Sequence, residues 1–516
     1  MKNFYFFTIL LFSVNVVQAQ IVNIPDANFK NALVNTNCVD TNGNGAGDID
    51  ADTNNDGEIQ ESEAEAVIRL NVDWQNISSL EGIQSFTNIM DLRCRDNLLT
   101  SLNQNLNPNI EILYIGSNQL TSLDISQYSN LKRLSCYRNP LTNLDISQNP
   151  NLENLSCNNT QLSYLDISQN PNLKDLRCAY NQLSNLNISQ NPNLEVLNCI
   201  GNQLTNLDLS QNPNLIDLYC ADNLLSSLNL SQNPDLEYLN CGDNQLSSLD
   251  VTQNPNLEDL SCWTNQLTNL DLSQNPNLED LDCSNNQLTN LYLSQNPNLE
   301  SLYCNNNELT NLDLSQNPNL ERLNCYSNQL TSLNLTQSHS LRNIYCNSNQ
   351  LTSLDLSQNY NVQYINCSNN LLTSLNIRNG NNQDLYLMNS RYNTNLSCIT
   401  VDNLTYAYNQ NCSQTSELGW CKDEWTGYNE NSNDECILGI TELKNIEVNI
   451  YPNPVKNILY VNYESPIDQI KIYTLHGQSL YETRKTQIDV SLLSPGLYLA
   501  SILIDGKKIV KKFIKN

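Results

Sequence analysis

Hydrophobic positions recur along this chain with a fixed spacing of 21 residues. The unit is clearest at 152–172, LENLSCNNTQLSYLDISQNPN, where leucine, isoleucine and cysteine stand at regular intervals. The Leu-x-Cys step has the period of two of a short strand with alternate side chains inward, and no window repeats at helical spacing. One unit cannot bury its own leucines, whereas stacked units can. The pattern therefore predicts a mainly β solenoid.

Each unit divides into halves of 10 and 11 residues that share the pattern L-x-x-L-x-[L/I/C]-x-x-N. The asparagine suits a turn that satisfies backbone groups, and the Asn-Pro-Asn corner ends any strand because proline lacks an N–H donor. The pattern resembles the leucine-rich repeat, in its 21-residue bacterial variety. The resemblance covers about residues 87–380 and implies a leucine-rich repeat solenoid of about fourteen repeats with capping regions.

Thirteen of the 18 cysteines occupy one slot of successive units, from Cys94 to Cys367. This slot is the third apolar position of the strand, so the sulfurs point into the core. Parallel Cβ vectors hold neighbouring sulfurs apart rather than at the dihedral angle of a disulfide. We expect free, buried thiols that pack as small hydrophobic groups. A metal site is disfavoured because the ladder has no histidine and no C-x-x-C spacing.

The N-terminus and the charge indicate a secreted protein without a nucleic-acid partner. Residues 1–19 have the charged start, apolar run and small-residue cleavage site of a signal peptide. The run is too short to span a membrane, and no other segment approaches the ~18 apolar residues that a spanning helix needs. The net charge of −29 offers no basic footprint for nucleic acid.

The non-repeating cap before the repeats contains a segment, 52–63, that fits the twelve-residue EF-hand calcium loop, with glycine at the sixth position. The expected ligands are Asp52, Asn54, Asp56, Glu58 through its carbonyl, and Glu63 as a bidentate carboxylate. We expect one structural calcium ion, and a solvated acidic loop is the alternative. A second loop begins at Asp40 but has Ala51 where the final glutamate belongs.

The two halves of the unit vary to different degrees within this one chain. The second half is nearly invariant and is interpreted as scaffold, whereas the first varies at outward positions around the cysteine. Aromatic and arginine side chains on a rigid strand face dominate protein recognition. Strand propensity or drift would look similar, but the equally exposed scaffold half has scarcely drifted. The predicted binding face comprises Tyr114, Tyr137, Tyr219, Tyr238, Trp263, Tyr303, Tyr326, Tyr345 and Tyr364.

A cysteine-rich segment follows the repeats. Disulfides are expected there because the protein is secreted and the segment lacks support from repeats, among Cys398, Cys412, Cys421 and Cys436. Four cysteines allow three pairings, and the sequence does not choose between them. Cys38 has no evident partner.

From about residue 446 the chain becomes basic and changes to strand-like runs separated by turns. Strands are expected at 448–451, 458–463, 469–474, 487–490, 496–504 and 508–514, with hairpin turns at 476–477 and 505–506. These runs predict a C-terminal antiparallel β-sandwich.

The motifs YPNP, LHGQ, SPGLY and KKFIK of this module begin at residues 451, 475, 494 and 511. They resemble, in order, those of the type A C-terminal sorting domain of type IX secretion. The resemblance implies export across the outer membrane and recognition by the type IX machinery. It also implies removal of the tail by a sortase-like enzyme, which leaves the protein released or attached to surface lipopolysaccharide.

The expected organisation is therefore a signal peptide (1–19), an N-terminal cap (20–86), the repeat array (87–379), a C-terminal cap and linker (380–445) and the sorting domain (446–516).

No catalytic arrangement is evident, because neither His339 nor His476 falls in a Ser/Cys–His pattern. Stacked carboxylates such as Asp124 are multiplied along the chain, whereas an active site would be unique. We expect a secreted or surface-anchored leucine-rich repeat protein, not an enzyme, that mediates protein–protein interaction or adhesion in the manner of internalins. The alternatives are a glycan-binding surface protein and a passive extracellular spacer or matrix protein.

Overall fold

The computed structural model describes residues 20–102, 106–412, 419–431, 436, 448–463, 467–475, 477–504 and 507–516. The chain divides into two compact units, residues 1–215 and 216–516. The predicted signal peptide and the turn residues His476, Asp505 and Gly506 lie outside the described residues. Among the residues that are described, no helix has the length and apolar character needed to cross a membrane.

The first unit begins with a cap that closes one end of the repeat core. Its helices are α1 (Ala27–Asn35), α2 (Glu61–Ala66) and the 3-10 helix η1 (Ile83–Ser85). The Asp26 carboxylate accepts the backbone N–H of Phe29 at 2.9 Å and so caps the first turn of α1. The buried ring of Phe29 lies 6.5 Å from that of Phe86, which follows η1. This contact joins α1 to the end of the cap, directly before the first repeat.

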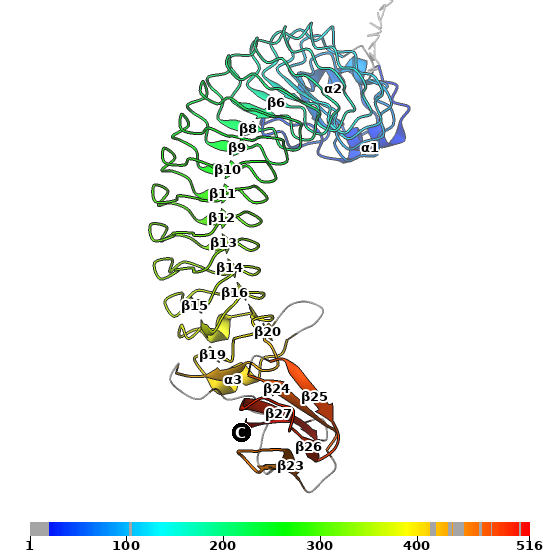
Figure 1. The fold of residues 1–516 in the computed structure, drawn as a ribbon. Helices are drawn as coiled ribbons and strands as arrows, with labels where there is room; N and C mark the ends of the chain where they lie inside the picture. The colour runs from blue at the N-terminus through cyan, green and yellow to red at the C-terminus, as the bar shows by residue number, and fades with distance from the viewer. Residues whose placement is uncertain are drawn as a thin grey trace, which may run out of the picture. The chain divides into compact units, whose positions relative to one another are not determined.

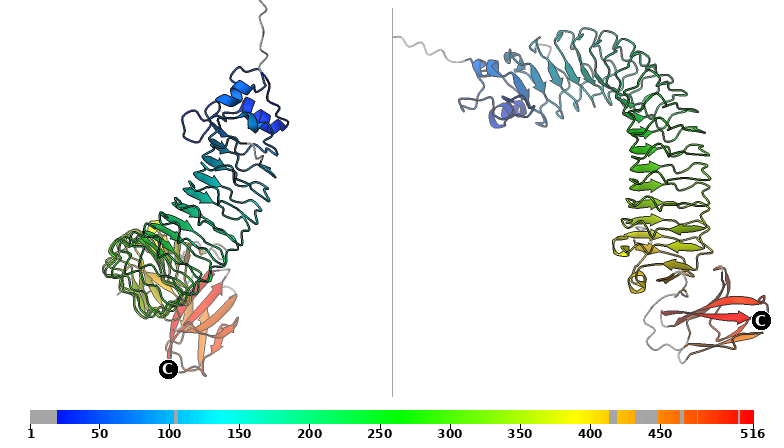
Figure 2. Two further views of the ribbon diagram at one scale, coloured as in Figure 1. Left: turned by 90° about the horizontal axis from the view of Figure 1, so that it is seen from above. Right: turned by 90° about the vertical axis from the view of Figure 1, so that its left-hand side faces the viewer.

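Seven short strands of the first unit pair in parallel, one from each successive turn of the chain (Figures 1 and 2). They are β1 (Arg69–Asn71), β2 (Asp91–Arg93), β3 (Ile112–Tyr114), β4 (Arg133–Ser135), β5 (Asn154–Ser156), β6 (Asp175–Arg177) and β7 (Val196–Asn198). The register is set by the repeat, since Leu155 on β5 lies opposite Leu176 on β6. Each central residue is buried, so the strands present alternate side chains to the core.

The second unit continues the same arrangement with ten strands. They are β8 (Asp217–Tyr219), β9 (Tyr238–Asn240), β10 (Asp259–Ser261), β11 (Asp280–Asp282), β12 (Ser301–Tyr303), β13 (Arg322–Asn324), β14 (Asn343–Tyr345), β16 (Tyr364–Asn366), β18 (Leu387–Asn389) and β20 (Gly419–Cys421). A second parallel sheet forms from the other half of the last turns. It contains β15 (Ser353–Asp355), β17 (Ser374–Asn376), β19 (Cys398–Thr400) and β21 (Gly427–Asn429). The short helices η2 (Asn382–Asp384) and α3 (Leu404–Tyr408) lie between these strands in sequence.

The expected fold is confirmed, with a solenoid of about 16 turns. The turns beyond the fourteen regular repeats come from the two predicted caps, which also contribute strands. β1 comes from the N-terminal cap and pairs with β2, and β18 and β20 come from the C-terminal cap. The core therefore extends beyond the regular repeats at each end.

Buried asparagines tie each turn to the one before it. The side-chain amide of Asn181 donates to the carbonyl oxygens of Cys157 (2.9 Å) and Cys178 (3.1 Å). At the Asn-Pro-Asn corner, Asn170 donates to the carbonyl oxygen of Asn149, one turn earlier, at 2.9 Å. These bonds satisfy backbone oxygens that the turns leave without a partner. They explain why asparagine recurs at both corners of the unit.

The ladder cysteines from Cys94 to Cys367 are free and buried, which confirms the expectation of unpaired thiols. Cys38 is also a free, buried thiol. Burial disfavours the thiolate and raises the pKa of Cys178 to about 12. The ladder is therefore a column of neutral packing groups between the leucines.

The C-terminal module consists of two antiparallel sheets around its own core. One contains β22 (Asn449–Tyr451), β23 (Ile458–Asn462) and β26 (Gln487–Asp489), and the other β24 (Gln469–Thr474), β25 (Ser479–Thr483), β27 (Gly496–Ile504) and β28 (Lys507–Lys515). Buried side chains such as Leu459, Ile470 and Phe513 fill the space between them. The expected β-sandwich is confirmed, with one strand, β25, that the sequence analysis missed.

Candidate binding face

The nine aromatic residues of the predicted binding face lie on strands or directly after them. Six are on strands, namely Tyr114 (β3), Tyr219 (β8), Tyr238 (β9), Tyr303 (β12), Tyr345 (β14) and Tyr364 (β16), and three follow a ladder cysteine, namely Tyr137, Trp263 and Tyr326. Tyr238 is 37% exposed and the others are half-buried. They occupy the outward positions of their strands, here called the strand face. Each ring is thus partly packed and partly available.

Two of these rings rest on glycines of the preceding turn. A methyl group on Gly242 would overlap the indole of Trp263, and one on Gly116 would overlap the ring of Tyr137. The rings therefore lie against backbone, which restricts their rotation and lowers the entropy lost when a ligand packs on them. The sequence analysis missed these glycines, although a glycine 21 residues before an aromatic residue is a detectable signal.

In the first unit the strand face carries its own cations. Arg93 pairs with Asp91 at 3.0 Å, and Arg95 pairs with Asp73 at 2.6 Å. Both guanidinium groups also lie over the ring of Tyr114, at 5.1 and 5.4 Å from its centroid. The chain itself therefore places a charged cluster around Tyr114.

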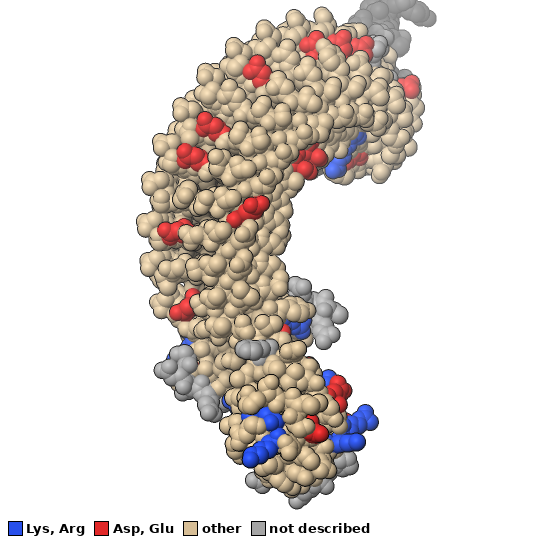
Figure 3. Space-filling view, in the orientation of Figure 1, with Lys and Arg blue, Asp and Glu red and all other residues tan. Residues whose placement is uncertain are grey.

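The strand face of the second unit has no such cations over most of its length. The sequence contains no lysine, arginine or histidine from residue 178 to residue 321. A space-filling view in the orientation of Figure 1 shows acidic side chains and no basic ones over β8–β12 (Figure 3). From residue 216 to residue 321 there are sixteen Asp and Glu. The sequence analysis overlooked this run, although it is visible in the printed sequence.

A column of glutamates runs along the edge of this face, one directly before each of β9–β13. Its members are Glu237, Glu258, Glu279, Glu300 and Glu321. Backbone hydrogen bonds of 2.7–2.9 Å join each glutamate to the next, which places neighbours one strand spacing apart, about 4.8 Å. Among the described residues only Glu321 of this column has an ion-pair partner, Arg342 at 3.4 Å. Like charges stacked in this way repel one another.

Further carboxylates lie on the strands beside the glutamate column. Asp259 on β10 lies opposite Asp280 on β11. Partial burial, together with the charges of Asp280 and Asp282, raises the pKa of Asp259 to about 6. Tyr238 donates to Glu258 at 3.3 Å, and the Glu258 charge raises the pKa of Tyr238. Carboxylates and aromatic rings therefore form one continuous surface.

Asn324 lies between two of the aromatic residues, since it pairs in register with Tyr303 on one side and Tyr345 on the other. Its buried side-chain oxygen accepts no hydrogen bond from the residues that the structure describes. A buried acceptor without a donor is unfavourable. Corner asparagines such as Asn170 also have a buried side-chain oxygen without a donor, so this feature does not by itself indicate a ligand.

The predicted calcium loop is closed by its own hydrogen bonds. Glu63 accepts from the Thr53 hydroxyl at 2.8 Å and from the backbone N–H of Gln60 at 3.0 Å. The Asp52 carboxylate accepts the backbone N–H of Gly57 at 2.8 Å. The described residues contain no group of three or more His, Cys, Asp or Glu placed to hold a metal ion. A carboxylate has lone pairs for both N–H donors and a cation, so these hydrogen bonds do not decide the matter, and calcium binding stays a prediction.

Two other predicted ligands of the loop are also engaged. Asp56 accepts the backbone N–H of Glu58 at 2.9 Å, and Asn54 donates to Gln60 at 2.7 Å. The Glu58 carboxylate pairs with Lys30 of α1 at 2.6 Å. Glu58 therefore links the loop to the cap helix, while its carbonyl, the group expected to bind calcium, is separate from that contact.

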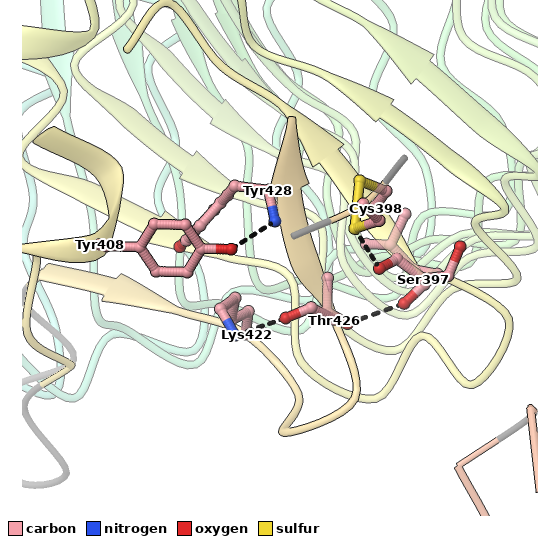
Figure 4. The surroundings of a disulfide bond; sticks show 8 residues. Ser397, Cys398, Tyr408, Lys422, Thr426 and Tyr428 are labelled. Atoms are coloured by element: carbon pink, nitrogen blue, oxygen red, sulfur yellow. Dashed lines mark hydrogen bonds between the residues drawn. A yellow bond between two sulfur atoms is a disulfide. The ribbon is translucent and has the colours of Figure 1, made fainter. Parts of the chain in front are cut away.

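In the cysteine-rich cap the structure pairs Cys398 with Cys436 and Cys412 with Cys421. Figure 4 shows the surroundings of the first pair, where the Thr426 hydroxyl donates to the carbonyl oxygen of Leu396 at 2.7 Å. This is one of the three pairings that the sequence left open. The disulfides lie beside β19–β21, where the regular repeats have ended.

His339 is an exposed corner residue rather than part of a catalytic pair. Its Nδ1 lies 3.0 Å from the carbonyl oxygen of Gln358, and its ring stacks at 6.3 Å from Tyr360. Among the described residues no serine or cysteine is hydrogen-bonded to its ring. The other histidine, His476, lies outside the described residues.

Comparisons with known proteins agree with this architecture. Residues 449–516 match the family model of the secretion system C-terminal sorting domain. A solved structure of the functional domain of InlJ from Listeria monocytogenes, described as including a cysteine ladder, is 25% identical, with a TM-score of 0.67 over 97% of this chain and 99% of that one. None of the curated proteins matches this chain in sequence.

Two more distant structures share the fold. A leucine-rich repeat protein of Leptospira interrogans is 28% identical with a TM-score of 0.52, over 60% of this chain and 92% of that one. The leucine-rich repeat ectodomain of a plant membrane receptor kinase from Arabidopsis thaliana is 23% identical with a TM-score of 0.52, over 65% of this chain and 47% of that one. The sorting domain indicates export, to the cell surface or out of the cell. The protein is thus an internalin-like leucine-rich repeat protein that carries a secretion system C-terminal sorting domain at residues 449–516.

Proposed function

We propose that this exported protein binds another protein through the strand face of its second unit, β8–β14, and that it is not an enzyme. The observation that carries the proposal is the combination of stacked carboxylates and aromatic rings on this face, where β8–β12 have no lysine or arginine and Arg322 on β13 is the first. Aromatic side chains are enriched at the centres of protein interfaces. Stacked carboxylates repel one another until a cation lies between them. A partner rich in lysine and arginine supplies that cation.

In the first unit, an arginine of the chain itself pairs with a strand carboxylate, and a partner would supply the same cation in the second unit. There Asp175 on β6 pairs with Arg177, two residues later, at 2.9 Å. At the matching positions of β11 the second unit has Asp280 and Asp282. The second unit thus keeps the carboxylate of Asp280, and among the described residues no cation pairs with it.

The aromatic rings favour the same class of partner. The contact of Arg93 with Tyr114 shows that this fold accommodates a guanidinium against a ring and a carboxylate together. Tyr238 and Glu258 offer the same combination to a guanidinium or ammonium group from outside.

We also propose that the protein reaches this partner through the type IX system, after signal-peptide cleavage, and is then released or attached to surface lipopolysaccharide. In a host with that system, removal of residues 449–516 is expected to leave the protein in the periplasm. Fractionation and immunoblotting measure this. Unchanged export of the truncated chain would refute the route.

Binding is tested by fluorescence anisotropy with a labelled lysine- and arginine-rich peptide and a glycine–serine peptide of equal length. We expect only the basic peptide to bind, more weakly at high salt. The triple variant Glu258→Gln, Glu279→Gln and Glu300→Gln should bind about tenfold more weakly, since each exposed pair contributes modestly. Gln363 already occupies this slot of the repeat, so the variant is expected to fold.

The matched control removes three exposed charges from the scaffold half, by Asp145→Asn, Asp166→Asn and Asp208→Asn. Asn187 occupies that slot and caps its turn, so folding is preserved. The control should bind the basic peptide as the parent does. Equal losses in both triple variants would mean that the overall charge alone attracts the peptide. Absence of binding at every salt concentration would favour the passive spacer.

The aromatic contribution is tested separately. Trp263→Ala and Tyr303→Ala should each weaken binding about tenfold, because truncating a central aromatic anchor commonly costs ~2 kcal/mol or somewhat less at a half-exposed site. Gln211→Ala and Gln274→Ala, in the invariant corners, are the controls and should not change it. Weaker binding in the corner variants alone would place recognition elsewhere on the molecule.

A further inference from the structure

One position of the scaffold half departs from its repeat. From Asp124 to Asn376 the slot between the last two apolar residues of the second half is aspartate or asparagine in every repeat but one. The exception is Tyr292. Because the slot is otherwise restricted to two residue types, the change in a single repeat calls for a physical reason.

The usual residue of this slot has a structural task that tyrosine does not perform. The Asp271 carboxylate accepts the backbone N–H of Ser273 at 3.0 Å, and the same Asx bond recurs at Asp250 and Asp313. A phenol ring cannot accept that bond in place of the carboxylate, because its oxygen lies too far from the backbone. Packing does not offset the loss, since Tyr292 is 76% exposed. Stability alone therefore does not explain the tyrosine.

The slot lies on a different side of the coil from the strand face. In the last turns the same segments form β15 and β17, which belong to a sheet separate from that of β14 and β16. Leu291 and Leu293 on either side of Tyr292 are buried, so the ring points outward from the scaffold half. A site here is independent of the proposed protein-binding face.

Two grooves meet at the Tyr292 ring. The larger has a volume of about 630 Å³ and extends over three turns, from Asp250 past Asp271 to Tyr292. The smaller, of about 200 Å³, lies between Tyr292 and Asp313. The larger groove is within the range of about 300–1,000 Å³ that is typical of small-ligand sites. Eleven of its fourteen lining residues are polar.

The lining groups are mostly hydroxyls, side-chain amides and carboxylates, including Thr268, Asn269 and Ser294 beside the ring. The Asx bonds of Asp250 and Asp271 are accepted by one carboxylate oxygen, Oδ1. The backbone hydrogen bond from Ser273 lowers the pKa of Asp271, and that carboxylate is therefore ionised at neutral pH. Its second oxygen is an acceptor for hydroxyl groups.

We propose that Tyr292 and the two grooves beside it form a binding site for a neutral oligosaccharide. The C–H face of a sugar ring stacks on an exposed aromatic ring, while its hydroxyl groups donate to carboxylates and exchange hydrogen bonds with amides and hydroxyls. Asp250, Asp271 and Asp313 repel uronic acids and sulfated sugars, which restricts the ligand to neutral chains. Successive turns are about 4.8 Å apart, so adjacent sugar units would meet equivalent polar groups.

The test uses saturation-transfer difference NMR on the exported chain with cellohexaose, laminarihexaose and xylohexaose as probes, and a hyaluronate hexasaccharide as the anionic comparison. We expect at least one neutral probe to bind and the anionic one not to bind. Tyr292→Asp should weaken that binding about tenfold or more, as expected for loss of a stacking ring. The variant restores the residue of neighbouring repeats, so its melting temperature should equal or exceed that of the parent.

Tyr164→Asn is the matched control, because Tyr164 is 64% exposed in the scaffold half of another repeat and lines neither groove. It should bind the oligosaccharide as the parent does. The proposal is overturned if no neutral probe binds, if Tyr292→Asp retains full binding, or if Tyr164→Asn loses as much. None of these results affects the basic-peptide assay, so the two proposals fail independently.

Discussion

A glycine on one turn of the solenoid determines where the aromatic side chain of the next turn lies. Gly242 leaves room for the indole of Trp263, whereas Ala179 and Ala221 occupy the same slot in turns without such a ring. The backbone of that slot thus tolerates alanine. An alanine methyl group would instead occupy the space in which the indole of Trp263 packs.

Gly242→Ala is therefore expected to displace Trp263 without unfolding the protein, and to weaken binding of the basic peptide several-fold. The measurement is ¹⁹F NMR of protein labelled with 5-fluorotryptophan, in which the Trp263 resonance, assigned with Trp263→Phe, should shift. Gly116→Ala, which crowds Tyr137 instead, should leave that resonance in place. An unmoved signal in Gly242→Ala would contradict the packing described here.

Asp259 shows how a single carboxylate on this face reduces stability. Its raised pKa, about 6, means that the folded protein binds a proton more tightly than the unfolded chain. Stability is therefore lost as the pH rises from about 4 through 6, and the cost of partly burying the charged carboxylate near Asp280 and Asp282 is fully present at neutral pH. The carboxylate is only about half-buried, so solvent screens part of this effect.

Asp259→Asn should stabilise the protein by about 1 kcal/mol at pH 7.5, after allowance for screening, and by little at pH 4. Asn154 and Asn343 occupy the same strand position in other turns, so the change is sterically acceptable. Calorimetric melting temperatures at the two pH values measure the difference. Equal stabilisation at both would show that charge repulsion is not the cause.

At the scale of the element, the Asn-Pro-Asn corner provides a matched pair of side chains. Asn170 is buried and donates to the backbone of the preceding turn, whereas Asn172 is exposed and donates to Pro150 at 3.1 Å. Each side chain donates one of the repeated hydrogen bonds between turns. Removal of the Asn170 side chain leaves a buried backbone acceptor without a donor, whereas removal of the Asn172 side chain leaves an exposed one.

Asn170→Ala should lower the free energy of unfolding by about 2 kcal/mol, because the backbone oxygens of the previous turn lose their donor away from water. Asn172→Ala should cost less than about 0.5 kcal/mol, as is usual at the surface. Urea unfolding followed by circular dichroism compares the two. Similar losses would mean that burial of the amide is not what matters.

The elements were predictable to the extent that they repeat. The Leu-x-Cys step located the strands because each leucine is buried and its neighbours are not. β25 was missed because Ser479–Thr483 is exposed along its length and so has no alternation to detect. The seating of Trp263 on Gly242 and the column of glutamates involve residues on neighbouring turns. Such relations become clear only when the register is known.

The calcium loop was predicted from ligand spacing alone, and spacing does not determine side-chain rotamers. In the structure Asp52 and Glu63 turn toward backbone N–H groups of the same loop. A carboxylate can accept these N–H groups and bind a cation together, so the hydrogen bonds neither require nor prevent calcium binding.

For the whole molecule, we expect calcium to stabilise the N-terminal cap, since a ligand that binds only the folded state adds about 2.7 kcal/mol at a concentration of 100 times its Kd. EDTA should lower the melting temperature of the parent, and Glu63→Gln should remove this sensitivity. Glu65→Gln, an exposed change in the same helix, should keep it. A full calcium response in Glu63→Gln would assign the ion to another site, such as the loop at Asp40.

The column of buried thiols has a consequence for how this protein must be delivered. Thiolates, not thiols, are attacked by oxidants, so the folded solenoid is chemically inert while an unfolded chain exposes every ladder cysteine at its ordinary pKa. An exported chain passes through compartments where disulfides form readily. Each cysteine that is oxidised before its turn is packed could no longer fit between two leucines. Folding therefore has to be faster than oxidation of the thiols. Once a turn is packed its thiol is protected, and a chain that stays unfolded for longer is oxidised and can no longer form the solenoid.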